Sequence, residues 1–520
     1  MSFSEQQTTT AQTHDTPKGA PSTQDRPATS RSIPRRRSWR TQARAAAAVV
    51  AGRASGALAR RLRLGGGTSL PGLVARRIDP DIATYLGAQL RHGSAVITGT
   101  NGKTTTSGLV AYVLRAAGIR IWRNREGANL MRGVTAALII RARPNGMLRR
   151  NGNAAAVFEV DEAAFPQVVA EVQPRVIAVT NLFRDQLDRY GEVDTVAERW
   201  RNALTTLPPA TRLVLNADDP TVAALARTDD QVEHAIYFGV EEALSLQTTT
   251  DVDAAGVVEV VDTRTCPRCG APLDFARRFY SHIGHWRCPG CGYARPRPQI
   301  AARAISADGL AGTRFALVTP NGEREVRINL PGLYNVYNAL TAAAVGYAMG
   351  VDLASTATAL GRFTPAFGRA ERIEANGRTV HLLLAKNPTG LNEVLRALAT
   401  TRTSPSPRQP HLLLLLNDHA ADGEDVSWIW DADVEQIAGL GAHVSVSGTR
   451  AYDLALRLKY AGAPAAHVEP DIPQALAWAL EQTPEGDTLY IVPTYTALLA
   501  VRGELERQGF APHYWEQQDA

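Results

Sequence analysis

Lysine is scarce in this sequence. Only four of the 520 residues are Lys, at positions 18, 103, 386 and 459, and Arg carries nearly all the positive charge. In a chain that uses Arg so consistently, a Lys is expected where an ammonium group is chemically required. Two of the four fall inside motifs described below. The formal net charge of +5 is small for this length.

Long apolar runs are also missing. No segment approaches the ~18 consecutive apolar residues that a membrane-spanning helix needs, so no such helix is expected. The first 45 residues are rich in Ser, Thr, Pro, Gln and Arg, and this composition predicts a disordered basic tail. The basic stretch 35–64 is compatible with contact to anionic lipid, although a solvated run of charge is the commoner explanation.

The only four Cys residues are confined to one short segment. They occur in "CPRCG" and "CPGCG" with the spacing C-x2-C-x18-C-x2-C, which is typical of a structural zinc site made by four thiolates. Two disulfides are one alternative, which the intracellular character of the other features disfavours. The interleaved basic and aromatic segment "ARRFYSHIGHWRC" leaves a nucleic-acid-binding ribbon as another. The predicted zinc ligands are Cys266, Cys269, Cys288 and Cys291.

Short apolar segments alternate with helical patterns over most of the chain. Strands are predicted at 94–98, 154–160, 175–180, 212–216 and 234–238, and again at 379–385, 411–416, 442–446 and 487–492. This alternation predicts an α/β fold with a mainly parallel sheet, followed by a smaller Rossmann-like α/β domain. We expect a tail over 1–45, a central ATP-binding domain over 46–366 with the Cys-rich insert at about 263–297, and a C-terminal domain over 367–520.

The segment "ITGTNGKTTT" (97–106) joins a predicted strand to a predicted helix through glycines. Such a turn points several backbone N–H groups at one place, and the helix N-terminus adds partial positive charge there. Lys103 can reach the β- and γ-phosphates of a nucleotide, and Thr104 can ligate Mg²⁺. This segment, which we call the phosphate loop, is a short variant of the strict P-loop pattern, because Ile97 stands where that pattern has its first Gly. The predicted nucleotide-binding residues are Gly99, Thr100, Asn101, Gly102, Lys103, Thr104 and Thr105.

Acidic and amide side chains follow the next predicted strands. Glu159 lies within the strand of "VFEVDEAAF" and is predicted to complete the Mg²⁺ site. Asp161 and Glu162 fit the cap and first turn of the following helix. In "LNADDP", Asn216 and Asp218 are candidates for ribose or adenine binding, and the alternative is that this segment caps a helix.

Six motifs occur in order along the chain: "TGTNGKTTT", "FEVDE", "TNLFRDQLDRYG", "LNADDP", "GLYNVYNALTAAA" and "FGRAE". Together they resemble the Mur ligase family, whose members use ATP to convert a carboxylate to an acyl-phosphate and then form an amide. The forms "FGRAER", "LAKNPTGLNEVL" and "ADGEDVSWIWD" are most similar to the MurT branch, the synthetase subunits of lipid II isoglutaminyl synthases. The resemblance covers about residues 46–515.

The resemblance implies an ATP-dependent carbon–nitrogen ligase that uses ATP, Mg²⁺ and Zn²⁺. The implied reaction amidates the α-carboxylate of D-glutamate in the lipid II stem peptide to D-isoglutamine, with ammonia from a partner glutaminase. A Mur-type ligase that adds an amino acid to a muropeptide is the alternative. The chain is then expected in the cytoplasm, at the inner face of the membrane where lipid II is made. No nucleic-acid partner is expected, because the ribbon interrupts an enzyme domain.

No Cys is left over for glutamine hydrolysis. Ammonia for amide synthesis usually comes from glutamine, often through a nucleophilic Cys. All four Cys of this chain are assigned to the zinc site, so a partner protein must supply the ammonia. This agrees with the resemblance, in which a GatD-type glutamine amidotransferase subunit forms a heterodimer with the synthetase.

Three further nucleotide contacts come from the family motifs. Asn335 and Asn338 lie three residues apart, which places them on one face of a helix. Arg369, in "FGRAE", is expected to contact the γ-phosphate across the junction between the two domains.

The sequence departs from the ordinary Mur ligase pattern in several places. Only about 90 residues precede the phosphate loop, which leaves no room for the usual UDP-binding domain. No Lys occurs between Lys103 and Lys386, so the carbamoylated Lys of several relatives is not expected. Gln186 follows Asp185 where the family has a His ligand for a second Mg²⁺. Lys386 replaces another His, and its fixed charge is predicted to neutralise the acyl-phosphate.

An acidic loop, "LNDHAADGEDVSWIWDADVE" (416–435), follows a predicted strand of the second domain. A solvated loop is the simple interpretation, but Trp428 and Trp430 are costly to expose and favour a partner surface. The His of a partner amidotransferase needs a third group to orient it, and an Asp of this loop can provide that group in trans. The resemblance implies the same role. We expect Asp425 to serve, with Asp422 as the second candidate.

Overall fold

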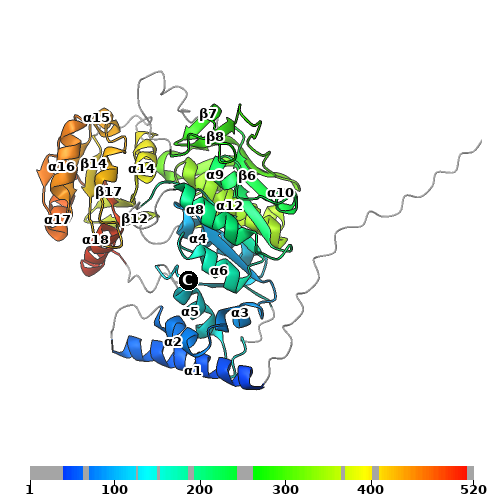
Figure 1. Cartoon of the computed structure of the whole chain (residues 1–520). Coiled ribbons are helices and arrows are strands. Elements are labelled where there is room, and N and C mark those ends of the chain that lie inside the picture. Colours follow the sequence, from blue (N-terminus) through cyan, green and yellow to red (C-terminus); the bar gives the residue numbers. More distant parts are fainter. Residues whose placement is uncertain are drawn as a thin grey trace, which may run out of the picture. The chain divides into compact units, whose positions relative to one another are not determined.

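The computed structural model contains two large β-sheets and one small hairpin (Figure 1). It describes residues 39–62, 69–124, 127–148, 153–185, 193–242, 262–364, 369–400 and 409–511, without the side chains of 369, 370 and 400. All of these residues belong to one unit that begins at Ile33.

The first sheet has nine strands in the order β11-β10-β9-β6-β5-β4-β1-β3-β2. The strands from β9 to β2 in this order run parallel, and β10 is antiparallel to both of its neighbours, β9 and β11. This confirms the predicted α/β fold with a mainly parallel sheet. The strands are β1 (Ser94–Thr98), β2 (Arg120–Arg123), β3 (Ala154–Glu159), β4 (Val176–Val179), β5 (Arg212–Asn216), β6 (Ile236–Val240), β9 (Ile300–Ala307), β10 (Thr313–Thr319) and β11 (Gly322–Ile328).

Two hydrophobic cores lie on opposite faces of this sheet. Along β1, Val96 packs into one core while Ala95 and Ile97 pack into the other, because successive side chains of a strand point to opposite faces. The core around Ile97 includes α4 (Lys103–Ala116), α12 (Leu333–Met349) and α13 (Leu353–Arg362). The core around Val96 includes α6 (Phe165–Val172), α8 (Val193–Leu204) and α9 (Pro220–Ala223), and the short α10 (Asp229–His234) precedes β6.

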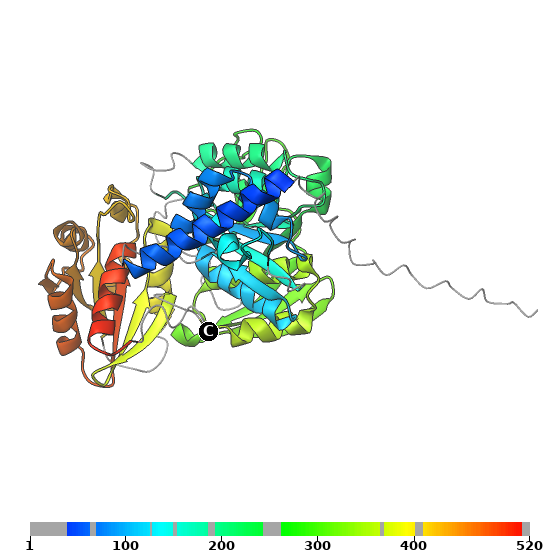
Figure 2. The ribbon, with the colours of Figure 1, turned by 90° about the horizontal axis from the view of Figure 1, so that it is seen from below.

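Four helices form a layer on the core around Val96. They are α1 (Trp39–Arg61), α2 (Leu70–Ile78), α3 (Ile82–Gly87) and α5 (Met131–Arg141). Helix α1 packs along α2, and Figure 2 shows it in front of the layer. Glycine permits the close packing of α2 against α5, since a Cβ on Gly72 would stand 1.8 Å from the Arg132 carbonyl oxygen. In the part of the chain that the structure describes, no helix has the length and apolar character needed to cross a membrane.

Helix α1 begins inside the segment that the composition assigned to a disordered tail. The structure corrects this prediction for residues 39–45, while residues 1–38 lie outside the described residues. Small buried side chains explain the difference, because Ala45, Ala48 and Val49 are fully buried in the helical layer. A helix without large apolar residues can still bury one face where its neighbours approach closely.

The Cys-rich insert forms the antiparallel hairpin of β7 (Asp274–Tyr280) and β8 (Ile283–Arg287). After it the chain returns to the first sheet through β9, β10 and β11, with η1 (Gly309–Ala311) between β9 and β10. The sequence patterns do not predict these three strands. The first four residues of β11 are exposed, and a charged edge strand of this kind has no apolar pattern to detect.

The second sheet has six strands in the order β12-β13-β17-β14-β15-β16, and only β12 is antiparallel. This confirms a second α/β domain. The strands are β12 (Arg369–Ala375), β13 (Arg378–Leu383), β14 (His411–Leu415), β15 (His443–Ser447), β16 (His467–Val468) and β17 (Thr488–Pro493). The helices are α14 (Pro388–Thr400), η3 (Ser427–Trp430), α15 (Gln436–Leu440), α16 (Ala451–Tyr460), α17 (Ile472–Gln482) and α18 (Tyr495–Arg507).

Partial burial of His381 is expected to make the second sheet sensitive to acid. Its ring lies in β13 with the centroid 5.8 Å from that of Tyr490. Burial, aided by the charge of Arg372, lowers the pKa of His381 to about 4. A His whose pKa is depressed stabilises the fold above its unfolded pKa of ~6.5, and this stability is lost as the pH falls through the folded pKa.

We therefore expect His381→Phe to weaken the pH dependence of stability. Between pH 7 and pH 5, the free energy of unfolding should fall by roughly 2 kcal/mol more in the wild type than in this variant. Urea unfolding at the two pH values measures the difference, and His234→Phe, at an exposed His, is the control. Equal pH dependence of the wild type and His381→Phe would contradict the assignment.

Candidate functional site

A cavity of about 420 Å³ lies at the carboxyl ends of β1 and β3. Its walls come from the phosphate loop, the segment after β3, α12 and the start of α14. The volume suits a ligand of nucleotide size, and the carboxyl ends of parallel strands are the usual place for one. The cavity brings together most of the predicted site residues: Thr100, Asn101, Gly102, Lys103, Thr104, Thr105, Glu159, Asn335, Asn338 and Lys386.

Two glycines shape the loop between β1 and α4. Gly99 and Gly102 have φ angles of +136° and +81°, which side chains of L-residues rarely tolerate. A Cβ on Gly99 would lie 2.1 Å from Thr180 Oγ1, and one on Gly102 would lie 2.1 Å from Asn338 Oδ1. Only Gly fits these two positions, so the loop can lie directly against the end of β4 and against α12.

The ammonium of Lys103 is fully engaged in the structure. Its Nζ donates to the Gly99 and Thr100 carbonyl oxygens at 2.6 and 3.2 Å, and to the two Glu162 oxygens at 3.0 and 2.9 Å. Burial raises the pKa of Glu162, and the charges of Lys103 and Lys386 oppose that rise. The structure corrects the prediction that Asp161 and Glu162 supply the cap and first turn of a helix, because α6 begins only at Phe165 with Ala164 as its N-cap. The Glu162 carboxylate instead faces Lys103.

The side chains of Thr104 and Glu159 are in contact, as a joint role in Mg²⁺ binding requires. Thr104 Oγ1 donates to Glu159 Oε1 at 2.9 Å. Asn124 fixes the end of β3, since its amide donates to the Glu159 carbonyl oxygen at 2.8 Å and its oxygen accepts from the Glu159 N–H at 3.0 Å. A hydroxyl and a carboxylate together form oxygen donors of the kind that Mg²⁺ prefers. Their role as metal ligands stays a prediction.

The start of α14 forms another wall of the cavity. Asn387 caps this helix, because its Oδ1 accepts from the Gly390 N–H at 2.8 Å. The amide of Asn387 also donates to Asn101 Oδ1 in the phosphate loop at 3.0 Å. The first residues of α4 and of α14 both line the cavity, so the partial positive ends of two helices meet there.

Lys386 pairs with Asp185 beside the cavity. Asp185 is buried, and its Oδ2 forms a short ion pair with the Lys386 ammonium. Asp185 directly precedes Gln186, the position at which the family has a His ligand. Gln186 lies outside the described residues. Like Lys103, Lys386 therefore reaches the cavity with its charge compensated by a carboxylate.

Helix α12 presents Asn335 and Asn338 to the cavity on one face, as predicted. Asn338 Nδ2 donates to Asn335 Oδ1 at 3.0 Å, and Asn338 Oδ1 accepts from Thr106 Oγ1 at 3.0 Å. These bonds hold the start of α4 against α12. Apolar surface for a planar base comes from three rings that also line the cavity: Phe183, Tyr280 and Tyr334.

Asn216 and Asp218 do not line the cavity. Asp218 is fully buried, where it accepts from the Val240 N–H at 2.7 Å and the Tyr337 hydroxyl at 2.6 Å and pairs with Arg295. Asn216 is fully buried too, and its Oδ1 accepts from the Asp218 N–H at 3.0 Å. The structure thus corrects the predicted contact with ribose or adenine, because Asp218 instead ties the first sheet to the insert.

The helix-capping alternative for "LNADDP" and the predicted contact of Arg369 remain to be compared with the structure. The capping alternative for the same segment is confirmed, because Asp219 accepts from the N–H groups of Thr221 and Val222 at the start of α9. The side chain of Arg369 lies outside the described residues, so its contact with the γ-phosphate stays a prediction.

The structure distinguishes the two Asp residues of the acidic loop. Asp422 is buried and accepts from the Thr496 N–H at 2.8 Å and from the Thr496 hydroxyl, so it holds the start of α18. Asp425 is exposed and accepts from the Ser427 N–H at 2.8 Å. Hydrogen bonds from Ser427 lower the pKa of Asp425, which keeps it a carboxylate. Trp430, on the same loop, is half exposed.

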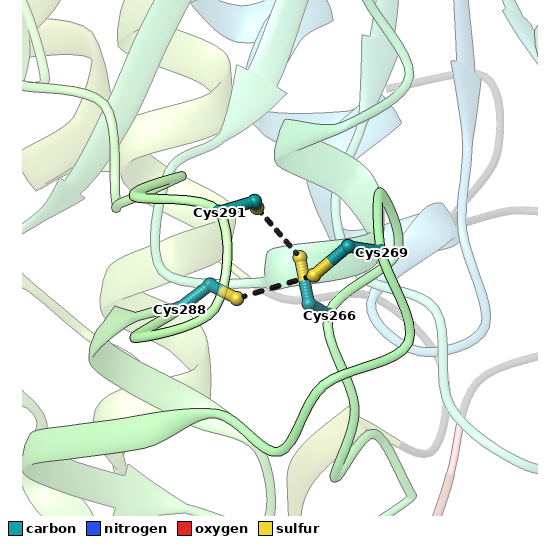
Figure 3. Close-up of side chains that lie close together, drawn as sticks. All are labelled: Cys266, Cys269, Cys288 and Cys291. Atoms are coloured by element: carbon teal, nitrogen blue, oxygen red, sulfur yellow. Dashed lines mark hydrogen bonds between the residues drawn. The ribbon is translucent and has the colours of Figure 1, made fainter.

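The four Cys side chains converge between the two turns of the insert (Figure 3). All four sulfur atoms lie within 4.8 Å of one another. Cys269 and Cys288 are 3.4 Å apart, and Cys266 and Cys291 are 3.7 Å apart. Thiolates bound at about 2.3 Å to a tetrahedral Zn²⁺ would be about 3.8 Å apart. The donor set and its size therefore fit one metal ion held by four thiolates.

The tip of the insert's hairpin reaches into the first domain. Between β7 and β8, His282 is fully buried, its ring centroid lies 4.9 Å from that of Phe183, and its Nε2 is 3.3 Å from Asp219 Oδ2. Burial lowers the pKa of His282, but the charges of Asp219 and Asp262 outweigh this and raise it. Tyr280, at the end of β7, lines the cavity. One short hairpin therefore connects the Cys cluster to the cavity.

Three residues at the cavity have no role in the sequence-based prediction of the site. Glu162 binds the phosphate-loop Lys, Asn387 contacts the loop, and Tyr280 lines the wall. Glu162 and Asn387 lie within the motifs "FEVDE" and "LAKNPTGLNEVL", and their place in these motifs is the signal that could have identified them. Tyr280 has no such signal, because its position depends on how the insert folds back.

Two regions of the chain match known protein families. Residues 97–264 match the Mur ligase middle domain, and residues 384–498 match the MurT ligase C-terminal domain. The chain is 35% identical over 463 residues to the lipid II isoglutaminyl synthase (glutamine-hydrolyzing) subunit MurT of Staphylococcus aureus (strain COL), covering 88% of this chain and 96% of that protein. The subunit of the same name from Streptococcus pneumoniae is 32% identical over 443 residues, covering 85% and 92%.

The fold is also similar to that of a solved peptide ligase. The pseudomurein peptide ligase type C from Methanothermus fervidus superposes with a TM-score of 0.60 at 23% identity, covering 81% of this chain and 80% of that one. This likeness concerns the fold alone, and it agrees with the two α/β sheets described above.

We expect the full-length protein to bind one metal ion per chain at the Cys cluster. Cys291→Ser removes one thiolate, so bound metal should fall below a tenth of the wild-type content and the melting temperature by roughly 5 °C or more. Nucleotide binding should weaken as well, because the same hairpin carries Tyr280. Elemental analysis, thermal unfolding and titration with ATP measure the three effects.

Arg297→Ala is the matched control for this experiment, since Arg297 is exposed in the same insert and is not one of the four thiolate-bearing residues. It should retain metal, stability and nucleotide binding. A metal-free wild-type protein, or a Cys291→Ser variant as stable as the wild type, would show that the cluster has no structural metal.

Proposed function

The chain belongs to the MurT branch of the Mur ligase family, and on this premise we propose that it is the synthetase subunit of a lipid II isoglutaminyl synthase. The reaction is the ATP-dependent amidation of the α-carboxylate of D-glutamate in the lipid II stem peptide. The observation that carries the proposal is the cavity, where two helix N-termini and two Lys side chains meet beside the Thr104–Glu159 pair. Such an arrangement suits phosphoryl transfer.

In the proposed first step, an oxygen of the substrate carboxylate attacks the γ-phosphorus of ATP. The bond between the γ-phosphorus and the β–γ bridging oxygen breaks, ADP leaves, and an acyl-phosphate remains on the substrate. Lys103 and the loop N–H groups bind the phosphates, because negative charge is spread over the phosphoryl oxygens in the transition state. Glu162 must release Lys103 for this, since both of its oxygens accept from the ammonium.

In the second step, ammonia attacks the acyl carbon. The carbon–oxygen bond to phosphate breaks, inorganic phosphate leaves, and the nitrogen loses a proton to give the amide. Lys386, at the cavity wall, would neutralise the departing phosphate. Ammonia would come from a GatD-type glutamine amidotransferase, because the chain's four Cys are gathered in one cluster that is proposed to hold the metal. The words "glutamine-hydrolyzing" and "subunit" in the relatives' name support such a partner.

Two metals are proposed at separate places. Thr104 and Glu159 would hold Mg²⁺, which supplies charge compensation for the phosphates when it is bound. The four thiolates would hold Zn²⁺ in a closed structural site, since no position is left open for substrate. One oxygen of Asp185 is paired with Lys386, so a second Mg²⁺ at this carboxylate would compete with that ammonium.

Lys103→Ala should abolish ATP-dependent amidation. It removes the ammonium proposed to bind the phosphates, so kcat should fall at least about 1,000-fold, equivalent to roughly 4 kcal/mol of transition-state stabilisation. Release of inorganic phosphate with ammonium chloride and a water-soluble muropeptide measures turnover. Lys459→Ala, at an exposed Lys of α16, is the matched control.

Two results would overturn the proposed reaction. Near-normal turnover of Lys103→Ala would remove the phosphate loop from the chemistry. Wild-type turnover that requires an added amino acid instead of ammonium would identify the chain as an amino-acid ligase.

Asp425 is proposed to orient the catalytic His of the partner amidotransferase. We expect Asp425→Asn to lower glutamine-dependent amidation at least about 100-fold, because an amide cannot stabilise the imidazolium. Activity with ammonium and formation of the complex should be retained, since Asp425 is exposed and its only described side-chain bond is local. Parallel assays with glutamine and ammonium measure this, and Glu424→Gln, at the exposed neighbouring acid, is the control.

Asp422→Asn should behave differently, because buried Asp422 holds the start of α18. Its substitution should lower the melting temperature and reduce both activities together. A selective loss of glutamine-dependent activity in Asp422→Asn, with Asp425→Asn unaffected, would reverse the assignment.

A further inference from the structure

The solvent-facing side of α1 is apolar over most of its length. Six exposed side chains spaced three or four residues apart form one stripe, which we call the outer face of α1: Trp39, Ala43, Ala47, Val50, Ala54 and Leu58. Trp39, Val50 and Leu58 are 75%, 50% and 58% exposed. The opposite side of the helix is apolar too, because it is buried in the helical layer. A surface helix of a soluble domain normally carries charged residues on its outer face, so this face indicates contact with an apolar medium.

The apolar surface continues onto α2. Pro71 packs against Gly56 of α1, where a Cβ on Gly56 would lie 2.7 Å from the proline ring. This places Leu70 and Leu73, each 38% exposed, beside the C-terminal half of α1. Leu62, directly after α1, is 56% exposed.

The charge around this surface has a single sign. Between residues 26 and 78 the sequence contains thirteen Arg and no Asp or Glu. Arg40, Arg60 and Arg61 flank the outer face at the two ends of α1, and all three are exposed. An apolar stripe bordered by Arg, with Trp at one end, is the pattern of a helix that lies in the headgroup region of an anionic bilayer. A nucleic-acid surface would instead need its cations along the middle of the stripe.

Helix α5 connects this surface to the cavity. Its first turn contributes Arg132 to the cavity wall, and its N-cap residue Leu130 lines the cavity as well. Directly after its last turn, the Ala142 carbonyl oxygen accepts from Arg53 of α1 at 2.9 Å. Eleven helical residues span about 16 Å, so the outer layer lies roughly one short helix from the site.

We propose that the outer face of α1, together with Leu62, Leu70 and Leu73, binds the surface of an anionic lipid bilayer. The inference rests on the proposed function in one respect, which is that a lipid-anchored substrate must be met at the membrane surface. The helix inserts its apolar side chains at the level of the headgroups, and the flanking Arg side chains contact lipid phosphates. The cavity is thereby held about one helix length from the anchored end of the substrate.

Co-sedimentation of the full-length protein with vesicles tests this proposal without substrate. We expect binding to vesicles of phosphatidylcholine with 30 mol% phosphatidylglycerol, and at least tenfold weaker binding to phosphatidylcholine alone. Leu58→Glu should reduce binding at least tenfold, because it places a carboxylate in the apolar stripe. The double substitution Arg60→Gln and Arg61→Gln should reduce it about 25-fold, at about fivefold for each charge. Val50→Ser is a milder variant that keeps the test valid if Leu58→Glu fails to fold.

Leu456→Glu is the matched control, because Leu456 is 48% exposed on α16, a helix of the other sheet. It should bind vesicles as the wild type does. Turnover of a water-soluble muropeptide should be unchanged in Leu58→Glu, while turnover of lipid II in vesicles should fall with binding. If the wild type did not turn over the water-soluble muropeptide, the proposed function would be wrong. Vesicle binding would still test whether the outer face of α1 binds a bilayer.

Three results would overturn the proposal. The first is equal vesicle binding by the wild type and Leu58→Glu. The second is absence of vesicle binding together with binding of a DNA duplex that the Arg substitutions abolish, which would assign the surface to nucleic acid. The third is a dimer that Leu58→Glu dissociates in a protein that does not bind vesicles, which would assign the outer face to a second copy of the chain.

Discussion

The contact between Lys103 and Glu162 is the interaction on which the geometry of the cavity depends. It exists because β1 and β3 are parallel neighbours, with Ile97 opposite Glu159, so that the segments after both strands emerge at the same edge. The loop after β1 folds around the ammonium, and the turn after β3 supplies its counter-charge. The sheet register therefore determines where the cation stands. The glycines then allow α12 and the start of α14 to approach the same loop.

Much of this arrangement follows from local sequence. The alternation of apolar strands and helices predicts both sheets, and the glycine-rich turn predicts the phosphate loop, since both signals lie in consecutive residues. The pairing of Thr104 with Glu159 was also predictable, because a carboxylate at a strand end next to such a loop has few other neighbours. The thiolate cluster follows from spacing alone.

The remainder depends on contacts between distant segments, which no local pattern contains. Asp218 accepts a hydrogen bond from Tyr337 and pairs with Arg295, and both residues are far from it in the sequence. Its place beneath the insert therefore could not be inferred from "LNADDP". The edge strand β11 carries four charged residues, and its first four residues are exposed, so it has no apolar pattern to detect. Asp422 and Asp425 share one short acidic segment, and only the packing of α18 distinguishes the buried one from the exposed one.

The carboxylates on Lys103 and Lys386 have a consequence for which anions the cavity can hold. Each ammonium already has a carboxylate partner, so an entering anion must replace Glu162 or Asp185 rather than occupy an empty positive site. Chloride or a single phosphate ion offers too little charge to displace two buried carboxylates and leave them without cations. A polyphosphate that arrives with a divalent cation can do so, because the cation compensates the carboxylates that are released. We therefore expect small anions such as chloride to compete poorly for this cavity, because each ammonium already has a carboxylate partner.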